Sequence, residues 1–137
     1  MAGLRTSDTP TRTAKDLYER AQTGPLNYLV EGGGKQVWAD GVRAADANLL
    51  EAKYVENPAR SPYISGSDCP PFVRDAAQQQ ADKEFERYAA VLADAKNPVG
   101  ELEVITSDTR AVAFFEGLLR KYNIRGRVVV RPWTPGD

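Results

Sequence analysis

Three charged residues stand inside two short apolar segments, and their spacing is the strongest chemical signal in the sequence. Asp40 lies in segment 36–42, and Glu51 and Lys53 lie two residues apart in segment 49–55. Both segments alternate in polarity as strands do, so Glu51 and Lys53 share one face of their strand. A hairpin with an even-residue turn places Asp40 on the same side, whereas a slip of one residue would move it to the opposite face.

Two half-buried carboxylates beside a lysine predict a divalent-cation site that hydrolyses phosphodiester bonds. Carboxylates in apolar surroundings cost free energy unless a cation neutralises them. Mg²⁺ binds a small number of carboxylates together with water and substrate phosphate. The lysine can then position the attacking water or stabilise charge on the phosphate. The alternative is a structural ion pair on an edge hairpin, because short Glu-x-Lys strings are common.

The composition excludes most other catalytic chemistries. The 137 residues contain no histidine, and Cys69 is the only cysteine. Ser-His-Asp triads, Cys-His dyads, His-ligated zinc or haem and Cys-rich zinc sites are therefore ruled out. The net charge of −1 argues against a protein that merely coats nucleic acid. No apolar segment is long enough to span a membrane, and residues 1–10 lack the apolar core of a signal peptide.

The other segments predict the frame that positions the hairpin. Residues 1–10 are expected to form a flexible segment ahead of a single domain at 11–137. The order α-β-β-β-α-β-α-β predicts an α/β fold in which helices flank a mixed β-sheet. Periodicity predicts helices at residues 11–22, 72–95 and 108–122, and strands at 26–31, 36–42, 49–55, 102–106 and 127–131.

The long helix at 72–95 carries polar residues on the side that packs on the sheet. Its apolar face centres near Phe85, and the same stripe continues to Arg74 and Gln78 toward the N-terminus, with Asp82 at its margin. We therefore expect Gln78 to contact the lysine or the substrate and Arg74 to contact a phosphate. Solvated first turns of the helix are the alternative.

These features together resemble the PD-(D/E)xK nuclease superfamily. Asp40, the Glu51-x-Lys53 string and a following helix with Gln78 match its motif, and the predicted element order matches its core. The resemblance is narrower to restriction-endonuclease-fold toxin domains, which form the C-terminal ends of bacterial polymorphic toxins. It covers about residues 16–131 and rests on the strings ADG, LLEAKYVENP, SPYI, ERYAAVL, LEVITSDTRAVAFFEGLLR and RVVVR.

The resemblance implies a role for each motif residue. Asp40 and Glu51 would be metal ligands, joined by the backbone carbonyl of Ala52, and the metal would be Mg²⁺ or Mn²⁺. Lys53 would be the catalytic lysine. Gln78 would take the helix position that often holds a polar assistant.

Further candidates surround this set. Some superfamily members add an acidic residue from the first helix, which is Glu19 here, although a helical projection points it away from the apolar face. The proline that usually precedes the first acid is replaced by Ala39, and Asp46 is an alternative ligand in the expected turn. Arg60 and Tyr63 border the loop after the third strand, where they would stack on or steer nucleic acid or close the core.

The resemblance implies a metal-dependent endonuclease that acts as the toxic C-terminal domain of a secreted bacterial effector. A larger carrier would deliver it into the cytoplasm of a target cell, and a cognate immunity protein would block it. DNA is the favoured substrate, with RNA, including tRNA, as the alternative. Two rivals stay open: another metal-dependent hydrolase or phosphotransferase, and a non-catalytic interaction domain in which the acidic pair is structural.

Overall fold

Two adjoining sheets form the centre of the fold in the computed structural model, which describes residues 4–135. The first sheet has the strand order β1-β2-β3 and the second has the order β4-β5-β6-β7. The strands are β1 (Thr6–Asp8), β2 (Leu26–Gly32), β3 (Lys35–Ala39), β4 (Gly41–Arg43), β5 (Asn48–Lys53), β6 (Leu102–Thr106) and β7 (Gly126–Val130).

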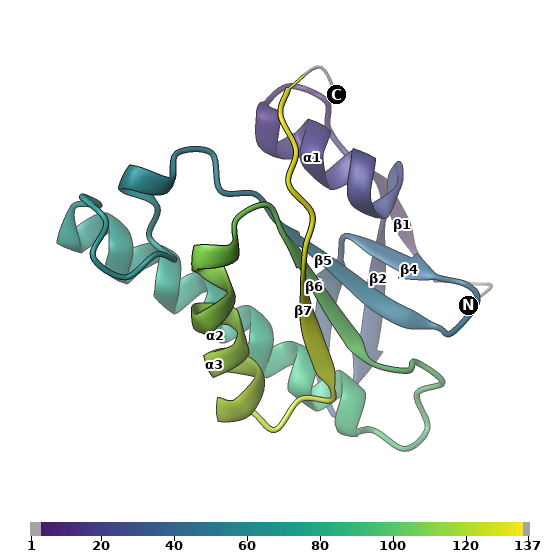
Figure 1. The fold of residues 1–137 in the computed structure, drawn as a ribbon. Coiled ribbons are helices and arrows are strands. Elements are labelled where there is room, and N and C mark those ends of the chain that lie inside the picture. Colours follow the sequence, from purple (N-terminus) through teal and green to yellow (C-terminus); the bar gives the residue numbers. More distant parts are fainter. Residues whose placement is uncertain (1–3, 136–137) are drawn as a thin grey trace.

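Three α-helices cover the strands from two sides. Figure 1 shows α1 (Ala14–Thr23) on one side, and α2 (Pro71–Ala93) and α3 (Val112–Lys121) on the other. Short 3-10 turns, η1 (Pro58–Arg60) and η2 (Thr109–Ala111), lie in the connecting segments. This arrangement confirms the predicted α/β fold with a mixed sheet flanked by helices.

The alternation of β5 separates the two cores. Leu49 belongs to the larger core, with Phe85 of α2 and Phe115 of α3. Ala52 belongs to the smaller one, beneath Tyr18 of α1. Each strand residue therefore contacts only one helix layer, as the period of two in a strand requires.

The pairing of β5 combines both strand directions. It runs antiparallel to β4, with Gly41 opposite Leu50, and parallel to β6, with Glu51 opposite Val104. β7 continues the parallel part beside β6. The helical connections through α2 and α3 return the chain to the same end of the sheet, which parallel pairing needs.

The expectation that the first ten residues carry no regular structure is wrong for β1. Thr6–Asp8 pairs antiparallel with β2, and the N–H of Thr9 donates to the carbonyl of Pro25 at 2.8 Å. All three side chains of β1 are exposed. The strand rests on backbone hydrogen bonds, so hydrophobic periodicity gives no signal for it. Residues 1–3 of that segment, and 136–137 of the predicted domain, lie outside the described part.

The predicted strand at 36–42 is divided into β3 and β4 at Asp40. The next residue, Gly41, lies directly under the end of α1: a Cβ there would stand 2.5 Å from the carbonyl oxygen of Thr23. Only a residue without a side chain allows the helix to approach this closely. The break therefore occurs where α1 meets the hairpin.

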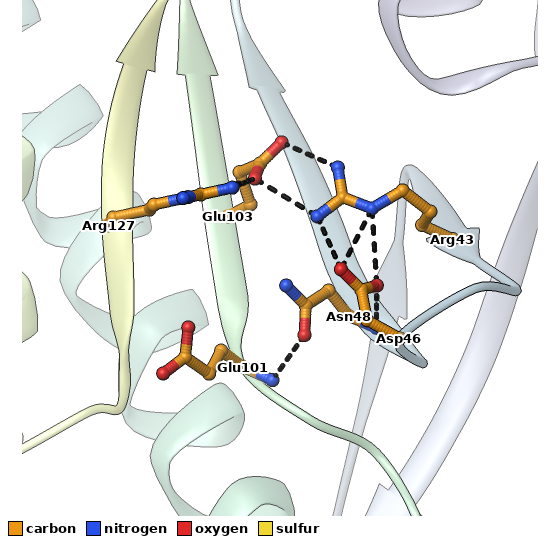
Figure 2. A network of polar contacts seen from close by, with 6 residues as sticks. All are labelled: Arg43, Asp46, Asn48, Glu101, Glu103 and Arg127. Atoms are coloured by element: carbon orange, nitrogen blue, oxygen red, sulfur yellow. Dashed lines mark hydrogen bonds and ion pairs between the residues drawn. The ribbon is translucent and has the colours of Figure 1, made fainter.

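A buried carboxylate on β6 has two arginine partners. Glu103 is 2% exposed, and its oxygens accept hydrogen bonds from Arg43 and Arg127 (Figure 2). Arg43 also binds Asp46, while Asn48 accepts a hydrogen bond from the backbone N–H of Glu101 at 2.8 Å. Asp46, the alternative ligand in the sequence analysis, is thus part of this network.

Candidate active site

The β4-β5 hairpin brings Asp40 to the strand that carries Glu51 and Lys53. Gly41 pairs with Leu50 at the start of β4, and Asp40 precedes it at the bend between β3 and β4. The Asp40 Oδ2 accepts a hydrogen bond from the backbone N–H of Ala52 at 2.7 Å. This register is the one that an even-residue turn requires.

Glu51 is enclosed between the sheet and α2. It is 3% exposed, and its Oε1 accepts a hydrogen bond from the Tyr88 hydroxyl at 2.5 Å. Its Oε2 lies 3.2 Å from the Lys53 Nζ. Burial and the charges of Asp40 and Glu84 raise the pKa of Glu51 well above its ordinary value, against the smaller opposite effect of Lys53.

Lys53 is held by two carboxylates. Besides Glu51, its Nζ contacts the Glu84 Oε1 at 2.7 Å, and the lysine side chain is 15% exposed. Burial disfavours the charged ammonium, but the two carboxylates outweigh it and hold the pKa of Lys53 above its ordinary value. Lys53 is therefore a cation at neutral pH, suited to stabilising negative charge and not to accepting a proton.

Two residues of the site, Glu84 and the hydroxyl of Tyr88, were not predicted from the sequence. Both lie on α2, one helical turn apart, and Glu84 follows Ala81 by three positions. This spacing places Glu84 on the helix face that packs on the sheet. The sequence therefore did contain a signal for Glu84, namely a carboxylate among the apolar residues on one face of α2.

Glu19 of α1 reaches Asp40, contrary to the helical projection. The two carboxyl groups interact, and the Glu19 Oε1 is buried without a hydrogen-bond partner. Burial, followed by the charge of Glu19, raises the pKa of Asp40 to about 8. The projection identified the apolar face of α1 correctly. Because the end of α1 packs closely on Gly41, however, Glu19 at the margin of that face also reaches the hairpin.

The donor set suits a hard divalent cation. Glu19, Asp40 and Glu51 offer oxygen atoms, which Mg²⁺ and Mn²⁺ prefer. Within residues 4–135, no group of three or more potential ligands already stands in a geometry that would hold a metal. Mg²⁺ needs only one or two carboxylates, with water and phosphate completing its shell. The raised pKa values and the unpartnered Glu19 oxygen therefore fit a cation at this position.

The backbone of Ala52 faces the same position. Its N–H bonds to Asp40, and the N–H and C=O of one strand residue point to the same edge of the strand. The carbonyl therefore leaves β5 toward the edge where Asp40 lies. This orientation agrees with the role expected for it from the resemblance.

Comparison with known families agrees with this geometry. The family model described as restriction endonuclease fold toxin 2 matches residues 14–125. The chain belongs to this family. The matched range contains the hairpin, Glu19 and the α2 residues Glu84 and Tyr88. Membership in this family indicates a nuclease toxin. Comparison with curated proteins gives no significant match.

In this toxin domain, the α2 residues that were expected to assist the site do not contact Lys53, and two of them bind a loop. Gln78 Nε2 donates to the carbonyl of Pro62 at 2.9 Å. Arg74 donates to the carbonyls of Pro62, Ile64 and Ser67 and to the Ser67 hydroxyl. Asp82 pairs with Lys121 and Tyr122. The polar partner of Lys53 on α2 is thus Glu84.

The loop fixed in this way forms one wall of a hollow at the site of the toxin domain. The hollow has a volume of about 320 Å³, and Lys53, Arg60 and Tyr63 are among its lining residues. Tyr63 also packs on Phe115, with ring centroids 5.0 Å apart. Tyr63 therefore contributes both to the core and to the wall, and Arg60 stands exposed beside the lysine.

No helix among residues 4–135 is long and apolar enough to cross a membrane.

Proposed function

We propose that this toxin domain is a divalent-metal-dependent endonuclease that hydrolyses phosphodiester bonds, with DNA as the favoured substrate. The observation that carries the proposal is a cluster of four buried or partly buried carboxyl groups that contains one lysine. The carboxyl groups belong to Glu19, Asp40, Glu51 and Glu84, and the lysine is Lys53. A purely structural cluster would balance these charges, because unpaired buried charge is costly.

Different residues of the site would bind the metal ion and stabilise charge on the substrate. Asp40 and Glu51, with the Ala52 carbonyl and support from Glu19, would hold Mg²⁺ or Mn²⁺. A bound ion of this kind lowers the pKa of water and neutralises charge on the phosphate. Lys53, kept protonated by its two carboxylate partners, stabilises the negative charge that develops on the phosphate oxygens.

Tyr88 and Glu84 orient this pair from α2. The Tyr88 hydroxyl donates to Glu51, and Glu84 accepts from Lys53. Such outer contacts fix the rotamers of residues that bind metal or substrate. They therefore act as positioning residues, and a Gln78 contact to the lysine is not needed.

Family membership supports the biological setting that we propose. The domain would be the toxic C-terminal end of a secreted bacterial effector, carried by a larger delivery protein into the cytoplasm of a target cell. A cognate immunity protein would inhibit it. Both partners can be sought by co-purification from cells that express the domain together with neighbouring reading frames.

The deciding experiment incubates the purified chain with plasmid DNA and, separately, with total RNA, in Mg²⁺, Mn²⁺ or EDTA. Lys53→Ala is compared with Lys96→Ala, an exposed lysine in the turn after α2. We expect metal-dependent DNA cleavage that only Lys53→Ala abolishes. Cleavage of RNA alone would reassign the substrate. No cleavage of either, with no metal binding by calorimetry, would favour a non-catalytic interaction domain.

A further inference from the structure

A second hollow shares the Glu84 side chain with the site. It has a volume of about 710 Å³ and lies between β3 and α2. We call it the Trp38 groove and define it by Gln36, Trp38, Gln80, Lys83, Glu84 and Arg87. Glu84 ties it to the site, because the same carboxylate contacts the Lys53 Nζ at 2.7 Å.

The α2 wall of the groove is a polar stripe. Gln80, Lys83, Glu84 and Arg87 follow one another at intervals of three, one and three residues, which places them on one face of the helix. Lys83 and Arg87 are exposed and form no ion pair with another residue of 4–135. Glu84, the acidic member, is already engaged by Lys53. The wall therefore offers two unpaired cations.

The strand wall offers an exposed aromatic ring. Trp38 is 42% exposed, although its neighbours Val37 and Ala39 are buried in the core. Strand alternation points Trp38 away from the core. An exposed indole that lines the same hollow as two cations is a combination suited to single-stranded nucleic acid, in which bases stack on aromatic rings and phosphates pair with Lys and Arg.

The contact between Lys53 and Glu84 joins the two hollows. Lys53 lines the smaller hollow together with Arg60, and its partner Glu84 lines the Trp38 groove. A strand whose scissile phosphate lies at Lys53 would therefore extend into both. An intact duplex covers the faces of its bases, so Trp38 can stack only on an unpaired base.

We propose that the Trp38 groove binds an unpaired stretch of nucleic acid next to the scissile phosphate, so that the domain prefers single-stranded or locally opened substrates. A base stacks on Trp38, and Lys83 and Arg87 contact the backbone phosphates. This inference rests on the proposed nuclease function and names the form of its substrate.

The test measures binding in EDTA, where metal-dependent cleavage does not occur. In a Trp133→Phe background, Trp38 is the only tryptophan, so its fluorescence reports the groove. We would titrate short oligo(dT), oligo(U) and a DNA duplex of equal length. We expect the single strands to quench Trp38 and to bind about tenfold or more tightly than the duplex.

Substitutions then separate stacking from charge. In an anisotropy assay with labelled oligo(dT), Trp38→Ala should weaken binding by about 5- to 150-fold, the range of one lost stacking contact. Lys83→Ala and Arg87→Ala should each reduce the salt dependence of log K by about 0.7, as expected for one lost phosphate contact on a single strand. Lys96→Ala is the matched cation outside the groove and should change neither quantity.

Two results overturn the inference. The first is binding of the duplex that equals or exceeds binding of the single strands. The second is unchanged oligonucleotide binding by Trp38→Ala, which would favour a polypeptide as the ligand of the groove. Neither touches the nuclease proposal, which is judged by whether Lys53→Ala abolishes cleavage. Conversely, a chain that cleaves nothing yet binds single strands through Trp38 retains the groove and loses the nuclease.

Discussion

Two buried glutamates on neighbouring strands of one sheet have opposite surroundings. Glu103 of β6 is 2% exposed and accepts hydrogen bonds from Arg43 and Arg127 (Figure 2). Glu51 of β5 is 3% exposed, and its partners are one phenol and one lysine that is shared with Glu84. The exposed fractions of the two side chains are therefore nearly equal.

The difference lies in charge balance. Burial by itself would raise the pKa of Glu103, but the two guanidinium groups reverse the effect and lower it. The pKa of Glu51 is raised, because burial is joined by the charges of Asp40 and Glu84. A buried carboxylate that is paired with enough cations, such as Glu103, stabilises the fold. A group of carboxyls with too few cations, such as that around Glu51, favours binding of a metal ion.

The largest expected effect separates the two glutamates by activity. Glu51→Gln should lower metal-dependent cleavage by about 100-fold or more, the scale of losing one preorganised charge contact at the reacting group. The amide keeps the shape and still accepts from Tyr88, so the fold should survive. Initial rates of plasmid cleavage and a circular dichroism spectrum test this. Normal cleavage by a folded Glu51→Gln protein would place the metal elsewhere.

Glu103→Gln should show the reverse pattern, with a loss of stability and an intact rate per folded molecule. Removing the charge weakens the hydrogen bonds from Arg43 and Arg127, and charge-assisted bonds are worth about 1.5–3 kcal/mol each. Both arginines are partly exposed, so water recovers some of the loss. We expect the free energy of unfolding in urea to fall by about 2 kcal/mol. A rate loss without destabilisation would make Glu103 part of the site.

The two clusters should also respond to pH with opposite sign. The pKa of Asp40 is raised from 3.8 to about 8, so between these values the native state holds a proton that the unfolded chain has released. The metal-free protein should therefore lose stability as pH rises through this window. The lowered pKa of Glu103 contributes stability at neutral pH that is lost on acidification.

Thermal melts of wild type and Asp40→Asn at pH 5 and pH 8 test this sign. In EDTA the Asn variant should gain stability relative to wild type at pH 8, where about half of the wild-type Asp40 carboxyl groups are ionised, and should match wild type more closely at pH 5. Mg²⁺ competes with the proton, so it should stabilise wild type more at pH 8 than at pH 5 and should not stabilise the variant. An unchanged difference in stability between the two proteins at the two pH values would contradict the raised pKa of Asp40.

The sequence was informative where burial constrains the pattern. The alternation around Glu51 predicted that Leu49 and Glu51 share the core face of β5, whereas the register with Asp40 depended on the length of the turn. It was uninformative for β1, whose pairing involves only backbone groups. It also could not place Gln78, because that side chain donates to the carbonyl of Pro62 in a loop whose course the sequence does not encode. No periodicity encodes where a loop rich in proline folds.

On α2, apolar positions were easier to identify than the polar partners among them. Tyr88 lies in the core beside Phe85, yet its hydroxyl is the hydrogen-bond donor to Glu51. Glu84 shares its stripe and was not singled out. A carboxylate flanked at three and four positions by core residues is costly unless it has a partner. That cost is the signal by which such residues can be found in related sequences.

The smallest expected effect tests this reassignment along α2. Gln78→Ala removes one hydrogen bond to the Pro62 carbonyl, which is worth about 1 kcal/mol, and should leave the cleavage rate within about threefold of wild type. Glu84→Gln, six residues further along, should lower the rate by about 10- to 100-fold, the usual cost of losing a partner of a catalytic group. Gln78→Ala should instead speed proteolysis of the loop that it anchors. If Gln78→Ala lost more activity than Glu84→Gln, the loop would have to rearrange on substrate binding and bring Gln78 to Lys53, because nothing in its present contacts links it to the lysine.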